Sequence, residues 1–309
     1  MVVATYRRPE RLARLFAALA AQDHPAWELV VVDDASPDDT RTVLDELAGR
    51  ASFPVRVVHR EVNGGPAAAR EQGWRLAAHE LIAFTDDDCV PHPSWLAELV
   101  TQAAPSTVVV GQTRAAPDQE HLRGVFSRTI EVTDERFAQT CNVLYPREVL
   151  ERLGGFDQVL RTGEDTDLML RAREAGCAVV FSPAAVVEHD IRRSDWRAAV
   201  REAWSWSDLP GVVRRHPQLR AEVLHHRLFW KPTHPVALVA AVGLTQLARG
   251  RVVTAAVLAA PWVHRRLVLQ PTPVGPRRRL AVLPAQLAVD LTEVGAMARG
   301  SLRHRTLVL

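Results

Sequence analysis

The chain of 309 residues has only three cysteines, and they lie far apart at Cys89, Cys141 and Cys177. No Cys-x-x-Cys pair exists and the count is odd, so the sequence argues against a disulfide framework and against a zinc site. This cysteine usage is typical of a protein in a reducing cytosol. Lysine is nearly missing as well, since Lys231 is the only one. We interpret its scarcity as a bias of composition and infer no function from it.

The sequence also lacks a long hydrophobic run. Its two most apolar tail segments, Pro235–Leu247 and Val252–Val263, are each shorter than the ~20 residues that a helix needs to span a bilayer. We expect no signal peptide, because the first residues run directly into the strand-like Val2–Thr5. With 47% hydrophobic and 24% charged residues, the composition is that of a folded globular protein.

Negative charge is scarce at the end of the chain, which the formal net charge of +2 conceals. From residue 249 onward only Asp290 and Glu293 oppose a series of arginines. These arginines are Arg249, Arg251, Arg265, Arg266, Arg277, Arg278, Arg279, Arg299, Arg303 and Arg305. The N-terminal part must therefore be acidic. The basic tail favours an anionic surface as partner, with membrane lipid as one candidate, and we expect no nucleic-acid partner.

Short apolar runs alternate with helical periodicity in the first half, and this pattern predicts an α/β sheet. We expect strands over residues 2–5, 28–32, 55–58, 81–85 and 107–111. Helices are expected after Pro9, from Ser36 as N-cap with Pro37 in the first turn, and over Pro66–Ala78. Farther along we expect helices over 146–153, from Glu164 and over 280–298, and strands over 178–181 and 185–187.

Polar clusters follow the expected strands. Asp33-Asp34, Asn63-Gly64-Gly65 and Asp86-Asp87-Asp88 all fall at carboxyl ends, the edge at which parallel sheets bind ligands. Adjacent carboxylates repel one another, and their burial is costly unless a cation or a hydrogen-bond donor compensates. A divalent metal carrying a diphosphate would compensate the Asp triplet. A solvated acidic turn is the alternative for the triplet taken alone.

Five motifs in this order resemble those of family-2 glycosyltransferases with the GT-A fold, over about residues 2–192. They are Val30-Val31-Val32-Asp33-Asp34-Ala35-Ser36, Asn63-Gly64-Gly65-Pro66-Ala67-Ala68-Ala69-Arg70, Asp86-Asp87-Asp88, Gly154-Gly155-Phe156-Asp157 and Glu164-Asp165-Thr166-Asp167-Leu168. The resemblance implies an inverting enzyme that moves a sugar from a nucleotide-diphosphate donor to an acceptor hydroxyl. It implies an α/β fold, a Rossmann-like mixed and mostly parallel sheet flanked by helices, to which the tail adds a helical appendage.

The resemblance places recognition of the donor base at Asp34 rather than Asp33, because a carboxylate accepts an N–H of the base. A helix-capping turn is the alternative there. Thr5 and Arg7 would lie near the same base or its phosphates, although Arg7 equally fits a surface arginine.

The helix start at Asn63 and Gly64 would let the backbone approach the nucleotide closely, with a plain tight turn as the alternative. Arg70 would reach a phosphate or the ribose, with a solvated helical arginine as the alternative. Asp86 is expected to face the ribose, and Asp87, which belongs to the same nucleotide-binding stretch, to point elsewhere.

Asp88 is the residue that the resemblance assigns to direct contact with Mg²⁺ or Mn²⁺, which would stabilise the departing diphosphate. His189 is expected to complete the metal site or to contact the diphosphate, with an ordinary surface histidine as the alternative.

In the pair Glu164-Asp165, Asp165 is expected to be the catalytic base that removes the acceptor proton, and Glu164 to bind or orient the acceptor. Without the resemblance, both would be helix-capping residues. Gly155, Phe156 and Asp157 are expected in the loop over the sugar and the acceptor.

We expect a catalytic domain over 1–192, with a nucleotide-binding part to about 111 and an acceptor-binding part over about 112–192. A helical, arginine-rich region follows over 193–309. That region could pack on the catalytic domain, lie in the membrane interface or insert as a hairpin. Arg249 and Arg251 at the hairpin tip favour the interface.

The partners implied are a UDP-, GDP- or dTDP-sugar and a glycan or lipid-linked acceptor. The expected location is cytoplasmic and peripheral to the inner face of the plasma membrane, in cell-envelope or exopolysaccharide synthesis. A Gln-x-x-Arg-Trp motif is missing before Trp196, so single transfer is favoured over polymerisation.

Two other functions are weighed against glycosyl transfer. A sugar nucleotidyltransferase would also use carboxylate-bound Mg²⁺, but its glycine-rich loop is missing from Thr5-Tyr6-Arg7-Arg8-Pro9. A catalytically inactive sugar-nucleotide-binding protein is disfavoured because all the carboxylates that the chemistry requires are present.

Overall fold

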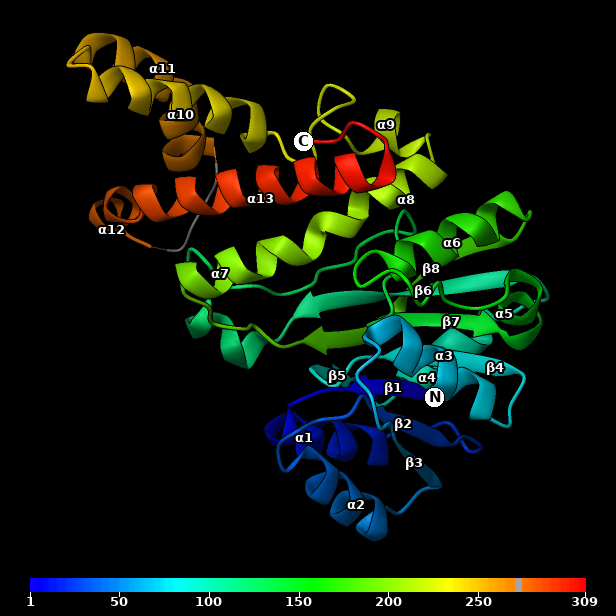
Figure 1. Cartoon of the computed structure of the whole chain (residues 1–309). Helices are drawn as coiled ribbons and strands as arrows, with labels where there is room; N and C mark the ends of the chain where they lie inside the picture. Colours follow the sequence, from blue (N-terminus) through cyan, green and yellow to red (C-terminus); the bar gives the residue numbers. More distant parts are fainter. Residues whose placement is uncertain (270–273) are drawn as a thin grey trace. The chain divides into compact units, whose positions relative to one another are not determined.

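The computed structural model describes residues 1–269 and 274–309, which form two compact units (Figure 1). The first unit comprises Met1–His121 and Thr129–Ile191, and the second comprises Leu122–Arg128 and Arg192–Leu309. The sheet belongs to the first unit, and the second is helical. The functional division expected at residue 192 stays a prediction.

An eight-stranded mixed sheet is the centre of the first unit, in the order β3-β2-β1-β4-β7-β6-β8-β5. The strands are β1 (Val2–Thr5), β2 (Leu29–Asp33), β3 (Val55–His59), β4 (Leu81–Thr85), β5 (Cys89–Pro91), β6 (Thr107–Ala115), β7 (Asn142–Pro146) and β8 (Ala178–His189). Strands β1 to β4 pair in parallel, as do β6 and β8, whereas β7 lies antiparallel between β4 and β6 and β5 is antiparallel to β8. The predicted mixed, mostly parallel sheet is confirmed.

Strand direction brings distant segments to one edge of this sheet. Two antiparallel steps, from β4 to β7 and from β7 to β6, restore the original direction, so β8 runs parallel to β4. The carboxyl ends of β1, β2, β4 and β8 therefore share one edge, and the polar residues that follow them are neighbours.

Helices cover both faces of the sheet. They are α1 (Pro9–Ala20), α2 (Thr40–Arg50), α3 (Pro66–Leu76), α4 (Trp95–Thr101), α5 (Arg147–Leu153) and α6 (Glu164–Glu174), with the 3-10 helix η1 (Pro117–Leu122) after β6. On one face Val3 and Val31 join a core with Leu12 of α1. On the other, a Cβ on Gly73 of α3 would lie 2.5 Å from Val2 Cγ1, so α3 packs directly on β1. Coverage on both faces explains the fully buried run of β2.

Two predictions about local structure in the first unit were wrong. The helix expected from Ser36 begins at Thr40, because Ser36 Oγ instead accepts a hydrogen bond from Arg7 N (2.9 Å) and Asp38 Oδ1 accepts one from Thr40 N (3.2 Å). The two strands expected over 178–181 and 185–187 are one strand, β8, with a register shift opposite the Gly111/Gln112 step of β6.

Asn142 closes the gap that this register shift leaves in the sheet. Its Nδ2 donates to the carbonyl oxygens of Gln112 and Ala185, both at 2.9 Å, and its Oδ1 accepts from Trp95 Nε1 at 2.8 Å. A Cβ on Gly111 would lie 2.2 Å from that Oδ1. The amide side chain therefore replaces ladder hydrogen bonds, in space that only glycine leaves open.

The second unit consists of helices. They are α7 (Trp196–Ala203), α8 (Leu209–Arg215), α9 (Leu219–Glu222), α10 (Thr233–Ala248), α11 (Val252–His264), α12 (Pro276–Ala281) and α13 (Leu283–His304), with η2 (Trp204–Asp208) and the π-helical η3 (Arg265–Leu269). The single helix expected over 280–298 is instead α12 and the longer α13.

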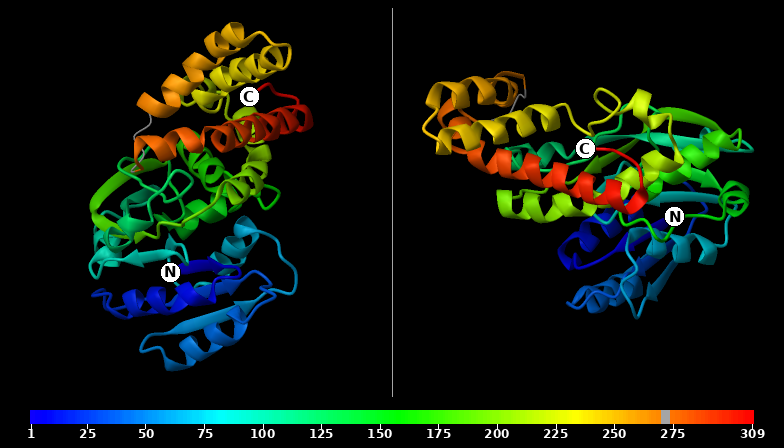
Figure 2. Two further views of the ribbon diagram at one scale, coloured as in Figure 1. Left: turned by 90° about the vertical axis from the view of Figure 1, so that its left-hand side faces the viewer. Right: turned by 45° about the horizontal axis from the view of Figure 1, so that its top comes forward.

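Helices α10 and α11 form an antiparallel hairpin in the second unit (Figure 2). Ala237, Ala240 and Trp262 are its buried core, against which Leu283 and Leu287 of α13 also pack. Among the described residues, one helical stretch, Val252–Leu269, is long and apolar enough by length and composition to cross a membrane, and 11% of it is buried. It exceeds the predicted segment because η3 continues α11.

Candidate active site

Asp34 follows β2 and organises the loop before α3. Its two carboxylate oxygens accept hydrogen bonds from Gly64 N (2.9 Å) and Gly65 N (2.7 Å), and Arg60 Nε lies 2.9 Å from Oδ1. Asn63 Nδ2 donates to the Asp34 carbonyl oxygen. The structure thus brings three predicted nucleotide-binding residues together. Recognition of the base by Asp34 stays a prediction.

Asp33 is fully buried and has a different environment. Its Oδ1 accepts from Ser36 N at 3.1 Å, and its Oδ2 lies 3.2 Å from His59 Nδ1. These contacts hold the turn after β2 and the edge strand β3, and Asp33 caps no helix, because α2 begins only at Thr40.

Arg70 joins two parts of the predicted site that are distant in sequence. From the second turn of α3, its Nη2 donates to Asp86 Oδ1 (2.6 Å) and its Nη1 donates to Glu164 Oε1 (2.8 Å). Arg70 is only 6% exposed. Burial opposes its charge, but Asp86 and Glu164 outweigh that effect and raise the pKa of the guanidinium. The Asp triplet and the start of α6 are therefore held against each other by one cation.

Two arginines that sequence reasoning missed bind the triplet from α1. Arg8 Nη1 donates to Asp87 Oδ1 (2.6 Å) and Asp88 Oδ2 (2.8 Å), and Arg11 Nη1 donates to the same Asp88 oxygen (3.0 Å). The predicted Arg7 is exposed, with its backbone in the left-handed region (φ 57°). A signal was present, because Arg8 and Arg11 have the three-residue spacing of one helix face.

Asp87 points back into the unit, where Thr5 Oγ1 donates to its Oδ2 at 2.7 Å, and a role for Asp87 in binding the nucleotide stays a prediction. Burial raises the pKa of Asp87 to about 6 despite Arg8. Asp88 is different, because His189, Arg8 and Arg11 outweigh the effect of burial and hold its pKa below the usual value.

Asp88 and His189 form a pair suited to a divalent metal. His189 Nε2 lies 3.5 Å from Asp88 Oδ1, the oxygen that Arg8 and Arg11 leave to it. The other ring nitrogen, Nδ1, lies 2.9 Å from the Asp190 carbonyl oxygen, an acceptor that fixes a proton on Nδ1. Nε2 is therefore the nitrogen that would bind a metal, which requires that Nε2 carry no proton. One carboxylate and one imidazole suit Mn²⁺ well and Mg²⁺ less well.

Cys89 lies beside this pair, and its Sγ is within 4.8 Å of the ligand atoms of Asp88 and His189. Burial holds the pKa of the Cys89 thiol well above its usual range. Because the thiolate is the ligand form, this environment favours a hard cation held by Asp88 and His189 over a thiolate-bound metal.

The helix start at Glu164-Asp165 carries two carboxyl groups with perturbed acidity. Burial, reinforced by Asp165, raises the pKa of Glu164 to about 7, although Arg70 opposes the shift. Burial also raises the pKa of Asp165, and Asp86 adds to the effect. Asp165 is partly exposed, and its Oδ1 accepts from Thr166 N at 2.7 Å. A partly exposed carboxylate of raised pKa has the properties of a general base.

The loop of Gly155, Phe156 and Asp157 is held by side chains of α3 and α6. Glu71 of α3 accepts from Phe156 N at 2.9 Å, and Arg171 of α6 donates to the Gly155 carbonyl oxygen at 2.7 Å. The Phe156 ring is 3% exposed and packs edge-on against Phe84, with centroids 5.3 Å apart. Phe156 therefore packs in the core, and a role for this loop in binding the sugar or acceptor stays a prediction.

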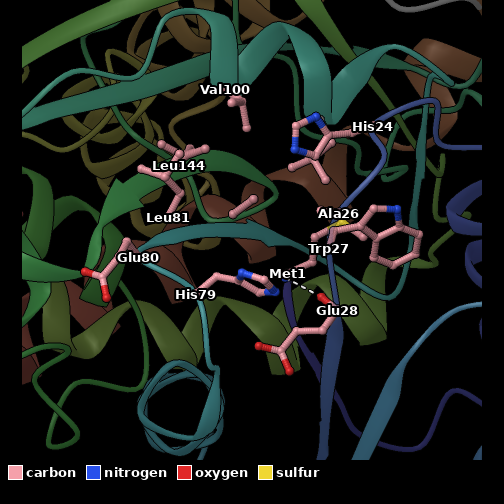
Figure 3. Close-up of a pocket in the computed structure, with 12 residues that line it drawn as sticks. Met1, His24, Ala26, Trp27, Glu28, His79, Glu80, Leu81, Val100 and Leu144 are labelled. Atoms are coloured by element: carbon pink, nitrogen blue, oxygen red, sulfur yellow. Dashed lines mark hydrogen bonds between the residues drawn. The ribbon is translucent and has the colours of Figure 1, made fainter.

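A separate pocket of about 290 Å³ lies at the opposite, amino-terminal edge of the strands (Figure 3). Met1, Glu28, His79 and Leu81 are among the residues that line it, and the Met1 amino group donates to the Glu28 carbonyl oxygen at 2.6 Å. None of the predicted site residues is among the described residues that line this pocket. The loops that carry the Asp34 and Asp86-Asp87-Asp88 motifs follow the carboxyl ends of β2 and β4, at the other edge of the sheet.

The family model described as "Glycosyl transferase family 2" matches residues 1–154. That range includes the Asp34 loop, Arg70 and the Asp triplet. Beyond it lie His189 and the Glu164-Asp165 pair, which rest on the geometry described above.

Relatives and solved structures agree with this match. Over 213 residues the chain is 27% identical to a pre-mycofactocin glycosyltransferase of Mycobacterium tuberculosis, covering 63% of this chain and 44% of that protein. It is 25% identical over 205 residues to glycosyltransferase AglE of Haloferax volcanii, covering 62% and 66%. The chain thus spans less than two thirds of the length of these relatives.

In three dimensions, the chain is similar to the mannosyltransferase PcManGT from Pyrobaculum calidifontis, solved with GDP-Man and Mn²⁺. The TM-score is 0.61 at 20% identity, covering 98% of this chain and 86% of that one. This likeness supports the predicted GT-A fold. The match to the family model over residues 1–154, with the glycosyltransferase relatives above, shows that the chain belongs to glycosyl transferase family 2.

Proposed function

We propose that the protein is an inverting glycosyltransferase that moves a sugar from a nucleotide-diphosphate donor to an acceptor hydroxyl. One observation supports it above the others, the Arg70 bridge between Asp86 and Glu164. Through it, the carboxylates assigned to the donor and those assigned to the acceptor lie around one buried guanidinium. Family membership and glycosyltransferase-named relatives support the same activity.

Asp165 acts as the base in this proposal. It takes the proton of the acceptor hydroxyl while the hydroxyl oxygen attacks the anomeric carbon from the side opposite the diphosphate. The bond from that carbon to the diphosphate oxygen breaks, and the nucleoside diphosphate leaves with the electron pair. Glu164 is anchored by Arg70 beside Asp165, where it positions the acceptor. Its pKa of about 7 leaves a proton on it in part of the molecules near neutral pH, and that proton can be donated to a sugar oxygen.

Asp88 and His189 would hold a Mg²⁺ or Mn²⁺, which when bound would stabilise the negative charge of the departing diphosphate. Arg8 and Arg11 donate to the other oxygen of Asp88 and, with His189, keep this carboxylate ionised. The donor set, one ionised carboxylate and one imidazole, supports this assignment.

The proposed donor is a UDP-, GDP- or dTDP-sugar, and the proposed acceptor is a glycan or a lipid-linked glycan of the cell envelope or an exopolysaccharide. The proposed location is the cytoplasmic face of the plasma membrane, with the enzyme bound peripherally. The apolar, arginine-rich second unit supports the membrane setting, and the three buried free cysteines are compatible with a reducing compartment.

Asp165→Asn tests the proposed base. Because general base catalysis contributes about 10²–10⁴-fold, we expect a fall of that size in kcat for sugar transfer. Binding of the nucleotide sugar with Mn²⁺ should be unchanged in a thermal-shift assay, since Asn keeps the shape of the side chain. Full transfer activity in Asp165→Asn would refute the assignment. Release of pyrophosphate from a nucleoside triphosphate and a sugar phosphate would instead identify a nucleotidyltransferase.

A further inference from the structure

The hairpin of α10 and α11 is apolar on every side, yet only its inner face is covered. The exposed residues over 239–248 are all apolar apart from Thr245, and those over 252–261 are all apolar apart from Thr254. The largest side chains among them include Val242 (53% exposed), Leu244 (53%) and Val253 (78%). A helix that is hydrophobic all round belongs in a protein core or in lipid, and this one is not in a core.

The hairpin has almost no polar group that would resist transfer into lipid. Thr245 Oγ1 donates to the Val242 carbonyl oxygen at 2.8 Å, so its hydroxyl is satisfied within the helix. Gln246 Oε1 accepts from Arg251 Nη1 at 3.3 Å. No Asp, Glu, Lys or Arg occurs between Lys231 and Arg249, or between Arg251 and Arg265.

Positive charge is placed at both ends of the hairpin. Arg249 and Arg251 are exposed at its tip. At its base, η3 contacts α12, where Arg277 and Arg278 are exposed. Helix α10 is about 24 Å long, since it has 16 residues, and the helical stretch Val252–Leu269 beside it has 18 residues. An anionic surface that meets both ends at once would lie parallel to the hairpin.

We propose that the outer face of the α10–α11 hairpin lies in the headgroup and upper acyl region of an anionic phospholipid leaflet, parallel to the membrane plane. Arginines at the tip and base then contact lipid phosphates, while Val242, Val253 and Val257 enter the acyl region. A tip-first insertion would bury Arg249 and Arg251 in hydrocarbon, which is costly. The inference deepens the proposed membrane location and takes its biological setting from it, but vesicle binding involves no sugar transfer.

Sedimentation of the full chain with vesicles tests the contact. We expect binding to vesicles of phosphatidylcholine with phosphatidylglycerol, and weaker binding to phosphatidylcholine alone. Val253→Glu with Val257→Glu should weaken binding by at least about tenfold, because both side chains lose their place in the acyl region. Leu302→Glu is the control, since Leu302 of α13 is 84% exposed and outside the hairpin. Replacing Arg249 or Arg251 by Ala should cost about fivefold each on anionic vesicles.

The orientation is tested by fluorophores on single added cysteines, at Ala248 near the tip and at Val257 in mid-helix, because the native cysteines are buried. Lipids with quenchers at known depths should give the same shallow depth for both labels. A deeper Ala248 label would overturn the parallel orientation. Unchanged binding of the double Glu variant would overturn the membrane contact. So would a stable dimer that this variant dissociates while vesicle binding persists, because a second copy would then cover the face.

Discussion

Arg70 shows how much a single side chain can determine in this protein. It is the only contact described above that joins the Asp triplet directly to the start of α6, and its Nε has no hydrogen-bond partner among the described residues. Two carboxylates from distant elements depend on it for compensation, in a place where water reaches poorly.

Arg70→Ala should therefore lower the free energy of unfolding by about 3–5 kcal/mol, because it leaves buried carboxylates without a partner. Arg50→Ala on α2 is the control. Arg50 and its partner Glu46 are both exposed, so its loss should cost less than about 1 kcal/mol. Urea denaturation of the three proteins measures both values. Equal costs for the two variants would contradict the role given to Arg70.

The ionisation of Glu164 should make the free energy of unfolding depend on pH. Its pKa is about 7 in the folded protein against 4.5 for an ordinary glutamate, so the folded state binds this proton more tightly than the unfolded state. The free energy of unfolding should then fall as pH rises from about 4.5 to 7, by on the order of 1–3 kcal/mol. Asp165, with its raised pKa, acts in the same direction.

Glu164→Gln removes this proton and should flatten that pH dependence while keeping an acceptor for Arg70. Glu10→Gln, at an exposed position of α1, is the control that should change nothing. The measurement is urea denaturation at a series of pH values. A wild-type stability that rises between pH 5 and 7, or a fall that the variant keeps in full, would show that Glu164 is not the group responsible.

At the scale of elements, the loop between α5 and α6 is held by contacts that leave no room for a side chain. Gly154 and Gly155 both have positive φ, at 75° and 71°. A Cβ on Gly155 would lie 2.1 Å from Glu71 Oε2, whereas one on Gly154 would meet nothing within 4 Å. An alanine at Gly154 would therefore add backbone strain alone, whereas an alanine at Gly155 would add both backbone strain and a steric clash.

Gly154→Ala should cost about 1 kcal/mol of stability, the price of the left-handed backbone alone. Gly155→Ala should cost about 2–4 kcal/mol, because it adds the conflict with Glu71 and breaks the contact to Phe156 N. Denaturation in urea gives both numbers. If the two variants lose the same stability, Glu71 moves freely and does not hold the loop.

Hydrophobic periodicity was sufficient to predict the strands and helices whose pattern is contained in a short stretch of sequence. The runs at Val2–Thr5 and Leu81–Thr85, and the apolar face of α1, encode their own structure through periodicity. By contrast, β7 and the three-residue β5 depend on partners far away in sequence, since β7 lies between β4 and β6 and β5 pairs with the end of β8. No short window contains that information.

Some residues of the candidate site could likewise be predicted from the sequence, and others could not. The Asp triplet, Arg70, His189 and the Glu164-Asp165 pair were accessible from motif order, and the structure places them in one connected network. Arg8 and Arg11 were missed because their three-residue spacing marks one helix face but does not say what that face contacts. Only the pairing of α1 with the end of β4 reveals their partners.

At the scale of the whole molecule, the two units carry separate proposed tasks. All proposed nucleotide and metal residues belong to the first unit, and the proposed lipid contact belongs to the second. A change in one unit should therefore leave the task of the other intact.

We expect a nucleoside diphosphate with Mn²⁺ to raise the melting temperature of the wild type, because a ligand stabilises the state that binds it. EDTA or Asp88→Ala should abolish the metal-dependent part of this shift without affecting vesicle binding. The variant with Val253→Glu and Val257→Glu should lose vesicle binding and keep the metal-dependent shift in melting temperature. Loss of both properties in either variant would show that the units do not act separately.

The close approach of Asn142 and Gly111 has a consequence for how this sheet can change over time. The amide that bridges the irregular step of β6 and β8 needs the space of the missing Cβ. Neither position is free to mutate alone, so descendants of this chain should keep the pair or lose both together. The presence of this Asn–Gly pair in a related sequence would then indicate that its sheet contains the same register shift.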